Sequence, residues 1–121
     1  MIVIKQAQSS DGKYYDFTLV KGDTGQFVAT PKVNGEPYVL LEGDSMDFKV
    51  SKKPNSEALL TVVADNENRF VVNAEASETL AVGDYYCDIT LNYANGNKDT
   101  FIKIPTSKGA AISNFHVTYG V

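Results

Sequence analysis

Short runs of alternating apolar and polar residues, broken at close intervals by turn-forming residues, set the strongest limit on how this chain can fold. In the clearest run, residues 46–51, the apolar residues Met46, Phe48 and Val50 alternate with polar neighbours. A longer run with the same period covers residues 85–93. Because successive side chains of a strand point to opposite faces of a sheet, this period predicts strands with one buried and one wet face. The sequence therefore predicts an all-β protein.

Turn signals separate these runs and fix where the predicted strands end. Asp11-Gly12, Asn34-Gly35 and Asn95-Gly96 are pairs that tolerate the positive φ angles of tight hairpins. Residues 74–81 do not alternate, and they predict a single helical turn with Leu80 as an inward-facing plug. Strands are predicted over residues 2–6, 15–19, 27–32, 38–41, 46–51, 58–63, 69–73, 85–93, 100–104 and 114–119.

Strands this short, with no amphipathic helix long enough to cover a sheet, predict two packed antiparallel sheets in one β-sandwich domain over residues 1–121. The chain shows no linker and no internal repeat. With 43% hydrophobic and 21% charged residues, its composition is that of an ordinary globular protein. No apolar run is long enough to span a membrane, and the first residues lack the pattern of a signal peptide. We therefore expect no membrane insertion.

The net charge and the scarcity of cysteine and histidine exclude several classes of function. A formal net charge of −4 argues against nucleic acid as a partner, since phosphate binding depends on clustered positive charge. Cys87 is the only cysteine and His116 the only histidine, so no internal disulfide can form and a zinc site would lack ligands. A reducing compartment suits such a chain.

Cys87 and His116 are also the only thiol and imidazole that could form a nucleophilic pair. Cys87 is in phase with the apolar residues of its strand, which favours an unreactive, buried thiol. His116 lies between Phe115 and Val117, and the alternation predicts that it projects to solvent from a terminal strand. We expect core packing for Cys87 and no catalytic role for either residue.

The acidic and glycine-rich segments do not match known catalytic or metal-binding patterns. The pairs Asp44 with Asp47 and Asp84 with Asp88 are closely spaced, but loop and wet-face positions favour solvated charges over a hydrolytic dyad. The loop 65–68 lacks the twelve-residue calcium pattern. Residues 22–25 lack the lysine and the following helix of a phosphate-binding loop. We expect no catalytic residues, no metal and no cofactor.

Tyrosine is the one residue type whose placement suggests binding. Of the seven tyrosines, Tyr14 and Tyr86 lie opposite apolar neighbours and are predicted to stay exposed. They are either ordinary residues on the outer face of a sheet or contacts for a partner. Together with Tyr93, they leave open a carbohydrate-binding or cell-surface-binding module as the alternative function.

Six short motifs follow one another through most of the chain. They are Gly-Asp-Thr at 22–24, Val-Asn-Gly-Glu-Pro-Tyr at 33–38, Gly-Asp-Ser-Met-Asp-Phe-Lys-Val at 43–50, Ala-Ser-Glu-Thr-Leu at 76–80, Val-Gly-Asp-Tyr-Tyr-Cys-Asp-Ile-Thr-Leu at 82–91 and Asn-Gly at 95–96. Their order resembles the immunoglobulin-like β-sandwich of tail and baseplate proteins from phages and prophages of Gram-positive bacteria, such as the amino-terminal domain of baseplate upper proteins. The resemblance covers about residues 22–104.

The resemblance implies a structural protein of a phage or prophage tail, located in the virion tail and, during assembly, in the host cytoplasm. Such a protein is non-enzymatic, and its partners are other tail or baseplate proteins or further copies of itself in a homo-oligomer. Residues 1–9 and 107–121 lie outside the resemblance and are possible assembly arms, because open strand edges can add to a neighbouring sheet. The candidate partner-binding residues are Ile2, Val3, Ile4, Tyr14, Tyr86, Phe115, Val117 and Tyr119.

Overall fold

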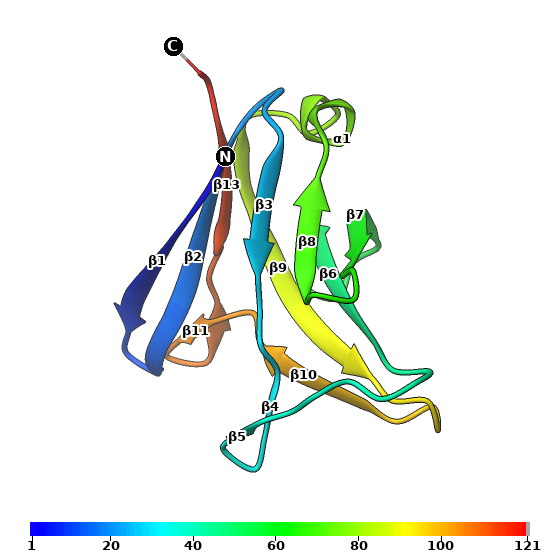
Figure 1. The fold of residues 1–121 in the computed structure, drawn as a ribbon. Coiled ribbons are helices and arrows are strands. Elements are labelled where there is room, and N and C mark those ends of the chain that lie inside the picture. The colour runs from blue at the N-terminus through cyan, green and yellow to red at the C-terminus, as the bar shows by residue number, and fades with distance from the viewer. Residues whose placement is uncertain (121) are drawn as a thin grey trace.

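The computed structural model describes residues 1–120, which form β-strands and one short helix (Figure 1). Strands make up most of the regular structure, so the predicted all-β class is confirmed. The elements are β1 (Ile2–Ser9), β2 (Gly12–Val20), β3 (Gly25–Val28), β4 (Lys32–Val33), β5 (Glu36–Pro37), β6 (Ser45–Ser51), β7 (Ala58–Val63), β8 (Arg69–Val72), α1 (Ala74–Glu78), β9 (Gly83–Asn92), β10 (Lys98–Ile102), β11 (Thr106–Ser107), β12 (Ala110–Ala111) and β13 (Phe115–Thr118).

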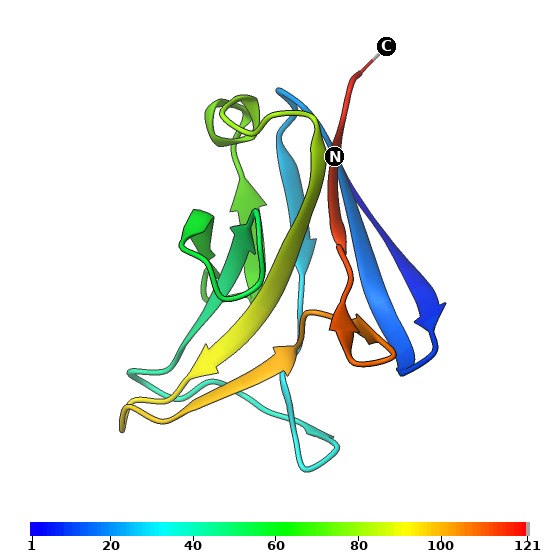
Figure 2. The ribbon, with the colours of Figure 1, turned by 180° about the vertical axis from the view of Figure 1, so that it is seen from behind.

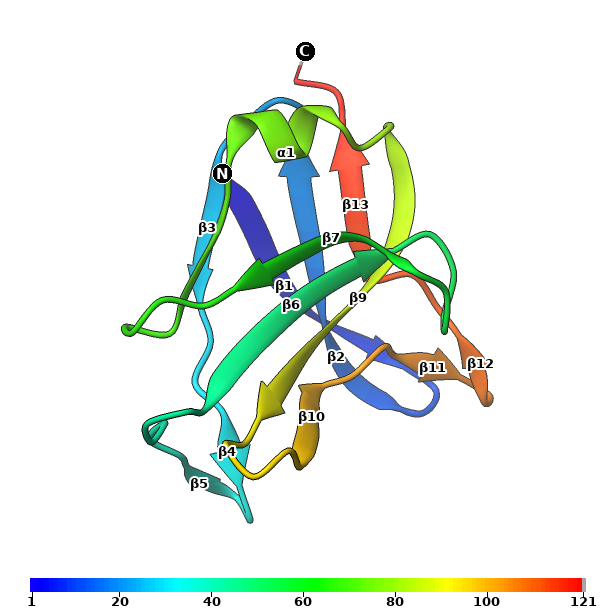
Figure 3. The same ribbon diagram turned by 90° about the vertical axis from the view of Figure 1, so that its right-hand side faces the viewer.

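A seven-stranded sheet forms the larger layer, with the strand order β1-β2-β13-β9-β6-β7 and with β10 also paired to β9. Neighbouring strands are antiparallel except β2 and β13, which run parallel. The long strand β9 pairs with β13 near its start and with β10 near its end, while β6 follows its other side. Figure 3 shows β6 and β7 crossing the direction of β2 and β13 at a large angle. This rotation is the accumulated twist of a large sheet.

A small sheet of β3 and β8 forms the second layer and packs on the larger one through aromatic rings. The ring of Phe27 lies 5.1 Å from Phe48 and 5.4 Å from Phe17, and it stacks on Phe70 at 5.0 Å. Edge-to-face and offset contacts at these distances add to the energy of simple burial. The two layers thus give the molecule a sandwich-like core.

The burial of side chains confirms the alternation predicted for the two central strands, β6 and β9. Met46, Phe48 and Val50 of β6 are fully buried, and so are Cys87 and its apolar neighbours on the same face of β9. Each buried aliphatic or aromatic side chain contributes about 1.5–3 kcal/mol relative to exposure. The energy of the fold is therefore concentrated where β6 and β9 face β3 and β8.

The turn chemistry also matches the sequence. Asn34 and Gly35 both have positive φ, 52° and 81°, and they close the β4–β5 hairpin as the Asn-Gly pair predicts. The predicted β1–β2 hairpin forms, but β1 continues to Ser9 instead of ending at Gln6. Regular pairing over the whole length of β1 accounts for the three added residues.

The short helix α1 covers one end of the two layers, as predicted. Asn73 is its N-cap, and the Asn73 side-chain oxygen accepts a hydrogen bond from the backbone N–H of Ala76 at 2.8 Å. Ser77 is buried, and its hydroxyl donates to the carbonyl of Val20. Leu80, just after the helix, is buried as the predicted plug.

Residues 38–41 were predicted as a strand, and this prediction is wrong. The segment pairs with no strand, because the N–H of Tyr38 donates to Pro31 and the N–H of Leu41 donates to the Asp44 side chain. The structure also contains a small β11–β12 hairpin, seen in orange in Figure 2, that the sequence pattern did not predict. Its strands have two residues each, too short to show a period.

Candidate functional site

Three of the eight candidate partner-binding residues are core residues, so this part of the prediction is corrected. Ile2 is 7% exposed, and Phe115 and Val117 are fully buried. Ile2 is covered by Gly25 of β3, whereas Phe115 and Val117 are buried because β13 lies between β2 and β9 inside the sheet instead of at an edge. A strand in this position has both its backbone edges paired and its apolar face covered.

The other five candidates remain accessible to different degrees. Val3, Ile4 and Tyr119 are exposed, whereas Tyr14 and Tyr86 are half-buried. Val3 and Ile4 belong to β1, an edge strand of eight residues that pairs only with β2 and has no bulge and no proline. Such an edge presents unpaired N–H and C=O groups to a further strand. It is therefore a surface to which another chain can add.

Burial falls steadily along the inner face of β1 and β2. At one end, Ile2 is opposite Leu19 and packs so closely against Gly25 that a Cβ atom at this position would clash with the Ile2 side chain. Further along the face, Ile4 is 38% exposed and Tyr15 is 45% exposed. Figure 1 shows β1 and β3 close together at the first end and separating toward the other. The second layer thus covers only part of this face.

An open cleft lies where β1 and β2 separate from β3. It has a polar lobe of about 340 Å³ and an apolar lobe of about 240 Å³, which share Tyr15, Phe101 and Ile102. The polar lobe is also lined by Gln6, Ser9, Asp11, Gly12, Lys13, Tyr14, Lys103, Ile104, Pro105 and Thr106, and the apolar lobe by Ile4, Phe17, Phe27, Val28, Ala29, Thr30 and Ile89.

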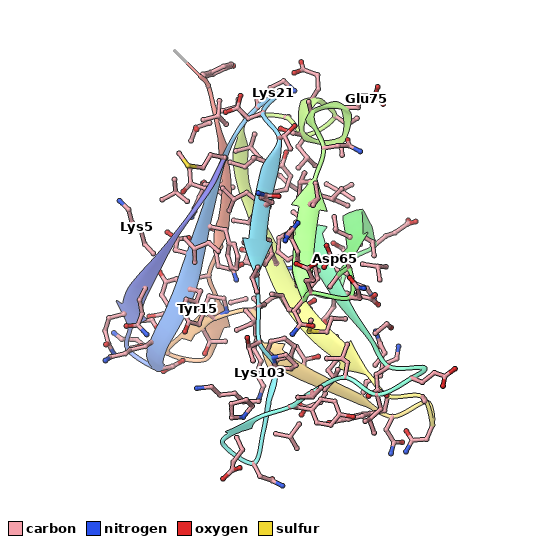
Figure 4. All side chains as sticks on the ribbon, in the orientation of Figure 1. Lys5, Tyr15, Lys21, Asp65, Glu75 and Lys103 are labelled. Atoms are coloured by element: carbon pink, nitrogen blue, oxygen red, sulfur yellow. The ribbon has the colours of Figure 1, made fainter. Side chains whose placement is uncertain are left out.

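The polar lobe is lined by two lysines and one carboxylate, that of Asp11. Lys13 and Lys103 are both exposed, and neither has a carboxylate within 4.0 Å among residues 1–120. Figure 4 shows Tyr15 and Lys103 at the same end of the molecule, away from Lys21 and Glu75. On a chain with a net charge of −4, this local excess favours an acidic ligand or partner.

Asp11, the one acidic residue of the cleft lining, is occupied by hydrogen bonds. Its Oδ2 atom accepts from the N–H of Gly109 at 2.9 Å and from the hydroxyl of Thr106 at 2.7 Å. These bonds, led by the one from Gly109, lower the pKa of the Asp11 carboxyl. They fasten the β11–β12 hairpin to the β1–β2 turn and so form one wall of the cleft.

A smaller pocket of about 200 Å³ lies beside Tyr86 on the outer face of the large sheet. Lys49, Ser56 and Asp88 are among its lining residues. Burial raises the pKa of Asp88, an effect that Lys49 partly opposes, and the Oδ1 atom of Asp88 is buried without a hydrogen-bond partner among the described residues. This pocket therefore combines an aromatic ring with polar groups.

His116 does not project freely into solvent as predicted, because two carboxylates enclose it. Its Nδ1 atom lies 2.7 Å from Asp84 and its Nε2 atom 2.7 Å from Asp16. Burial lowers the pKa of His116, but the hydrogen bonds and negative charges of Asp84 and Asp16 outweigh it and raise the pKa above its ordinary value of 6.5. The cluster connects β2, β13 and β9 across the outer face.

Cys87 has the role that its strand position predicts. Its side chain is buried, and burial raises the pKa of its thiol well above the ordinary value, so that the reactive thiolate is disfavoured. The ring nitrogens of His116 are occupied by carboxylates. The structure therefore brings no nucleophilic pair together from these two residues.

The carboxylates considered from the sequence stabilise turns or strand contacts. Asp44 accepts hydrogen bonds from the Tyr38 hydroxyl, the N–H of Leu41 and the N–H of Ala94, and the bond from Tyr38 contributes most to its lowered pKa. The side chain of Asp47 accepts a hydrogen bond from the side chain of Asn92.

Over residues 1–120, no group of three or more acidic, histidine or cysteine side chains is placed to hold a metal ion. Within the same residues, no helix is long and apolar enough to cross a membrane.

Sequence reasoning did not identify the cleft or its two lysines. One signal could have indicated it: on β1, the inner-face positions change from Ile2 and Ile4 to Gln6 and Gln8, which marks the point where the apolar cover ends. The segments 101–106 and 13–15 both line the cleft but are far apart in the sequence, so no local pattern indicates that they lie close together.

Comparisons of the chain with protein-family models, with curated proteins and with solved structures found no match.

Proposed function

We propose that the chain is an immunoglobulin-like β-sandwich that serves as a non-enzymatic structural or assembly protein of a phage or prophage tail or baseplate. Its partners are other tail proteins or further copies of itself. The strand arrangement supports the class. β7, β6 and β9, with β10 and β13 each paired to β9, fit one sheet of such a domain, and β3 with β8 fits part of the other. The parallel strand β2 beside β13 extends the first sheet.

The observation that carries the assembly role is the free edge of β1 beside the open cleft. Main-chain groups of β1 can bond to an added strand, while the cleft can accept its side chains. β1 is a regular edge strand with exposed apolar side chains such as Val3 and Ile4. An edge of this kind pairs with strands of other chains and leads to aggregation unless a partner covers it. Lys5 is the one charged residue of this edge, which has neither a bulge nor a proline, and a partner surface accounts for its regularity.

Purified tail particles from bacteria that produce the chain test this role. Mass spectrometry should find the protein in particles at a constant ratio to other tail proteins. Ile4→Lys should remove it from particles, because a charge at this edge opposes strand addition. Val71→Lys is the matched control, since Val71 is also an exposed apolar strand residue but lies on β8, outside the lining of the cleft. Absence of the unmodified protein from particles would contradict the proposal.

A second candidate function, carbohydrate binding, is favoured by the pocket beside Tyr86. A sugar could stack on the tyrosine ring and use its hydroxyl groups to bond Lys49 and Asp88. Nuclear magnetic resonance titration with glucose, galactose and N-acetylglucosamine tests it. Shifts confined to the amides around Tyr86 and abolished by Tyr86→Ala would support this function, and an unchanged spectrum with all three sugars would exclude it for these sugars.

A further inference from the structure

We infer that the open cleft binds residues 36–42 of a second copy of this chain, so that copies associate head to tail. The inference rests on the proposed assembly function and names the partner and the contact. The cleft and the 36–42 segment are separate surfaces of one molecule. Within that molecule, neither surface is fully covered by other residues.

After β5, residues 38–42 of the segment pair with no strand, and the exposure of their side chains alternates. Val39 is 80% exposed and Leu41 is 68% exposed, whereas Tyr38 and Leu40, between and beside them, pack against the core. This alternation is that of a strand with one free face. It is also the reason why the sequence predicts a strand here.

The backbone of the segment is also available. The N–H groups of Tyr38 and Leu41 are bonded to Pro31 and Asp44, but those of Val39 and Leu40 make no hydrogen bond among residues 1–120. An edge strand such as β1 offers the complementary groups, because every second residue directs its N–H and C=O away from its partner. In an extended segment the N–H of Val39 points away from the side on which Tyr38 bonds Pro31, so pairing with β1 of another copy would satisfy the N–H of Val39 and free groups of the β1 edge.

The side chains of the two surfaces are complementary in polarity. Val39 and Leu41 are apolar, and the apolar lobe of the cleft is lined by Ile4, Phe101 and Ile102. Burial of such side chains on both partners removes apolar area from water, which favours association.

The charges of the two surfaces are opposite. Glu36 and Glu42 flank the apolar residues of the segment, are exposed, and have no cationic partner within 4.0 Å among the described residues. Lys13 and Lys103 of the cleft are equally unpaired. Complementary charges of this kind determine which surfaces meet and in which register. The same chain thus carries both an acidic apolar segment and a basic apolar cleft.

Because the two surfaces differ, the contact is heterologous. Each copy offers a cleft to one neighbour and a segment to the other, which generates a closed ring or an open chain of copies. A two-fold contact between like surfaces would instead bring the lysines of two clefts together, and like charges oppose this arrangement.

Charge reversal with mixing tests the inference. One variant carries Lys13→Glu and Lys103→Glu, and the other carries Glu36→Lys and Glu42→Lys. Light scattering after size exclusion, over a concentration series, should show the unmodified protein above the 13.2 kDa of one chain. Each variant alone should associate about tenfold more weakly or not at all, because its cleft and its segment then have the same charge. An equal mixture should regain association, since both contacts between unlike copies are complementary again.

Controls of equal charge change are Lys53→Glu with Lys98→Glu and Glu57→Lys with Glu75→Lys, at exposed positions outside both surfaces. These should associate like the unmodified protein, and circular dichroism should show all variants folded. A monomer at every concentration, normal association of the Glu36/Glu42 variant alone, or no recovery on mixing would each overturn the inference. The proposed function has a separate test, since a monomeric protein can still be found in tail particles.

Discussion

The same pair of strands, β1 and β2, is closed against the second layer at one end and open at the other. At the closed end, Ile2 and Leu19 face each other and are buried beneath β3. At the open end of the same face, Gln6 is opposite Tyr15 and both are exposed. The backbone pairing is equally regular at both ends. The comparison shows that the cover provided by the two-stranded layer, and not the pairing of the hairpin, decides which residues belong to the core.

The closed region should therefore carry most of the stability, and the open region should be free to serve binding. Side chains beneath β3 and β8 lose their contacts outright when truncated, whereas those of the cleft already face water on one side. The following substitutions test this division, from the largest expected effect to the smallest.

Phe48→Ala should have the largest effect. Phe48 is fully buried and contacts the rings of Phe17, Phe27, Phe70 and Phe115. Its loss leaves a cavity in a close-packed region, and the free energy of unfolding measured with urea should fall by about 3–5 kcal/mol.

Tyr15→Ala is the matched substitution at the open end, on the same sheet. Because Tyr15 is 45% exposed, its truncation should cost only about 1 kcal/mol. If Phe48→Ala and Tyr15→Ala lowered the free energy of unfolding equally, the closed region would not carry more of the stability than the open region.

Asn114→Ala should have the second largest effect, after Phe48→Ala. The Asn114 side chain accepts a hydrogen bond from the N–H of Cys87 at 2.8 Å and donates to the carbonyl of Cys87 at 2.9 Å, so it replaces a missing strand between β10 and β13. Removal leaves two buried backbone groups of Cys87 unpaired and should lower the free energy of unfolding by about 2–4 kcal/mol. Asn97→Ala, at an exposed turn position, should change it little. If Asn114→Ala left the free energy of unfolding unchanged, other groups would have to form hydrogen bonds with the backbone N–H and C=O of Cys87.

The His116 cluster should produce a smaller effect that depends on pH. The folded state raises the pKa of His116 above 6.5, so protonated His116 stabilises the fold. This contribution is complete below pH 6.5 and is lost as the pH rises through the raised pKa of the folded protein. Urea unfolding at a series of pH values should show this loss in the unmodified protein and not in His116→Gln. The same pH profile for both proteins would assign the dependence to other groups.

Asp11→Asn should have the smallest effect on global stability, because the residue lies at the surface of the open end. Its carboxylate accepts from the N–H of Gly109 and the hydroxyl of Thr106, and these bonds lower its pKa. The substitution should speed hydrogen exchange of the Gly109 amide without a measurable shift of the unfolding midpoint. Acidification of the unmodified protein through the lowered pKa should have the same local result. Unchanged exchange at Gly109 would show that the β11–β12 hairpin is held by other contacts.

The parts of the fold that follow from local pattern could be predicted from the sequence. Alternation placed β6 and the buried face of β9, and the Asn34-Gly35 pair placed the β4–β5 hairpin. The same reasoning correctly assigned Cys87 to the core. In each case, neighbours in sequence contain the physical cause, either the pleat of the strand or the φ angles of the turn.

The parts that depend on distant segments could not be predicted. His116 was expected in solvent because nothing near it in sequence indicates that Asp16 and Asp84 lie on the two adjacent strands. For the same reason the sequence predicts Phe115 and Val117 as partner-binding residues although they are buried, and it does not indicate the cleft lysines. Strand order alone decides these contacts, and the period of a strand carries no information about its neighbours.

The position of β13 has a consequence for how the chain reaches its folded state. β13 follows all the other strands in sequence, yet it lies between β2 and β9 and pairs Phe17 with Phe115. During synthesis, β2 and β9 therefore keep their facing edges unpaired until residues 115–118 have been made. Contacts of such long sequence separation slow folding and leave strand edges exposed to other chains meanwhile. A chaperone that shields the β2 and β9 edges over this interval would raise the yield of folded protein more than one that acts after β13 is in place.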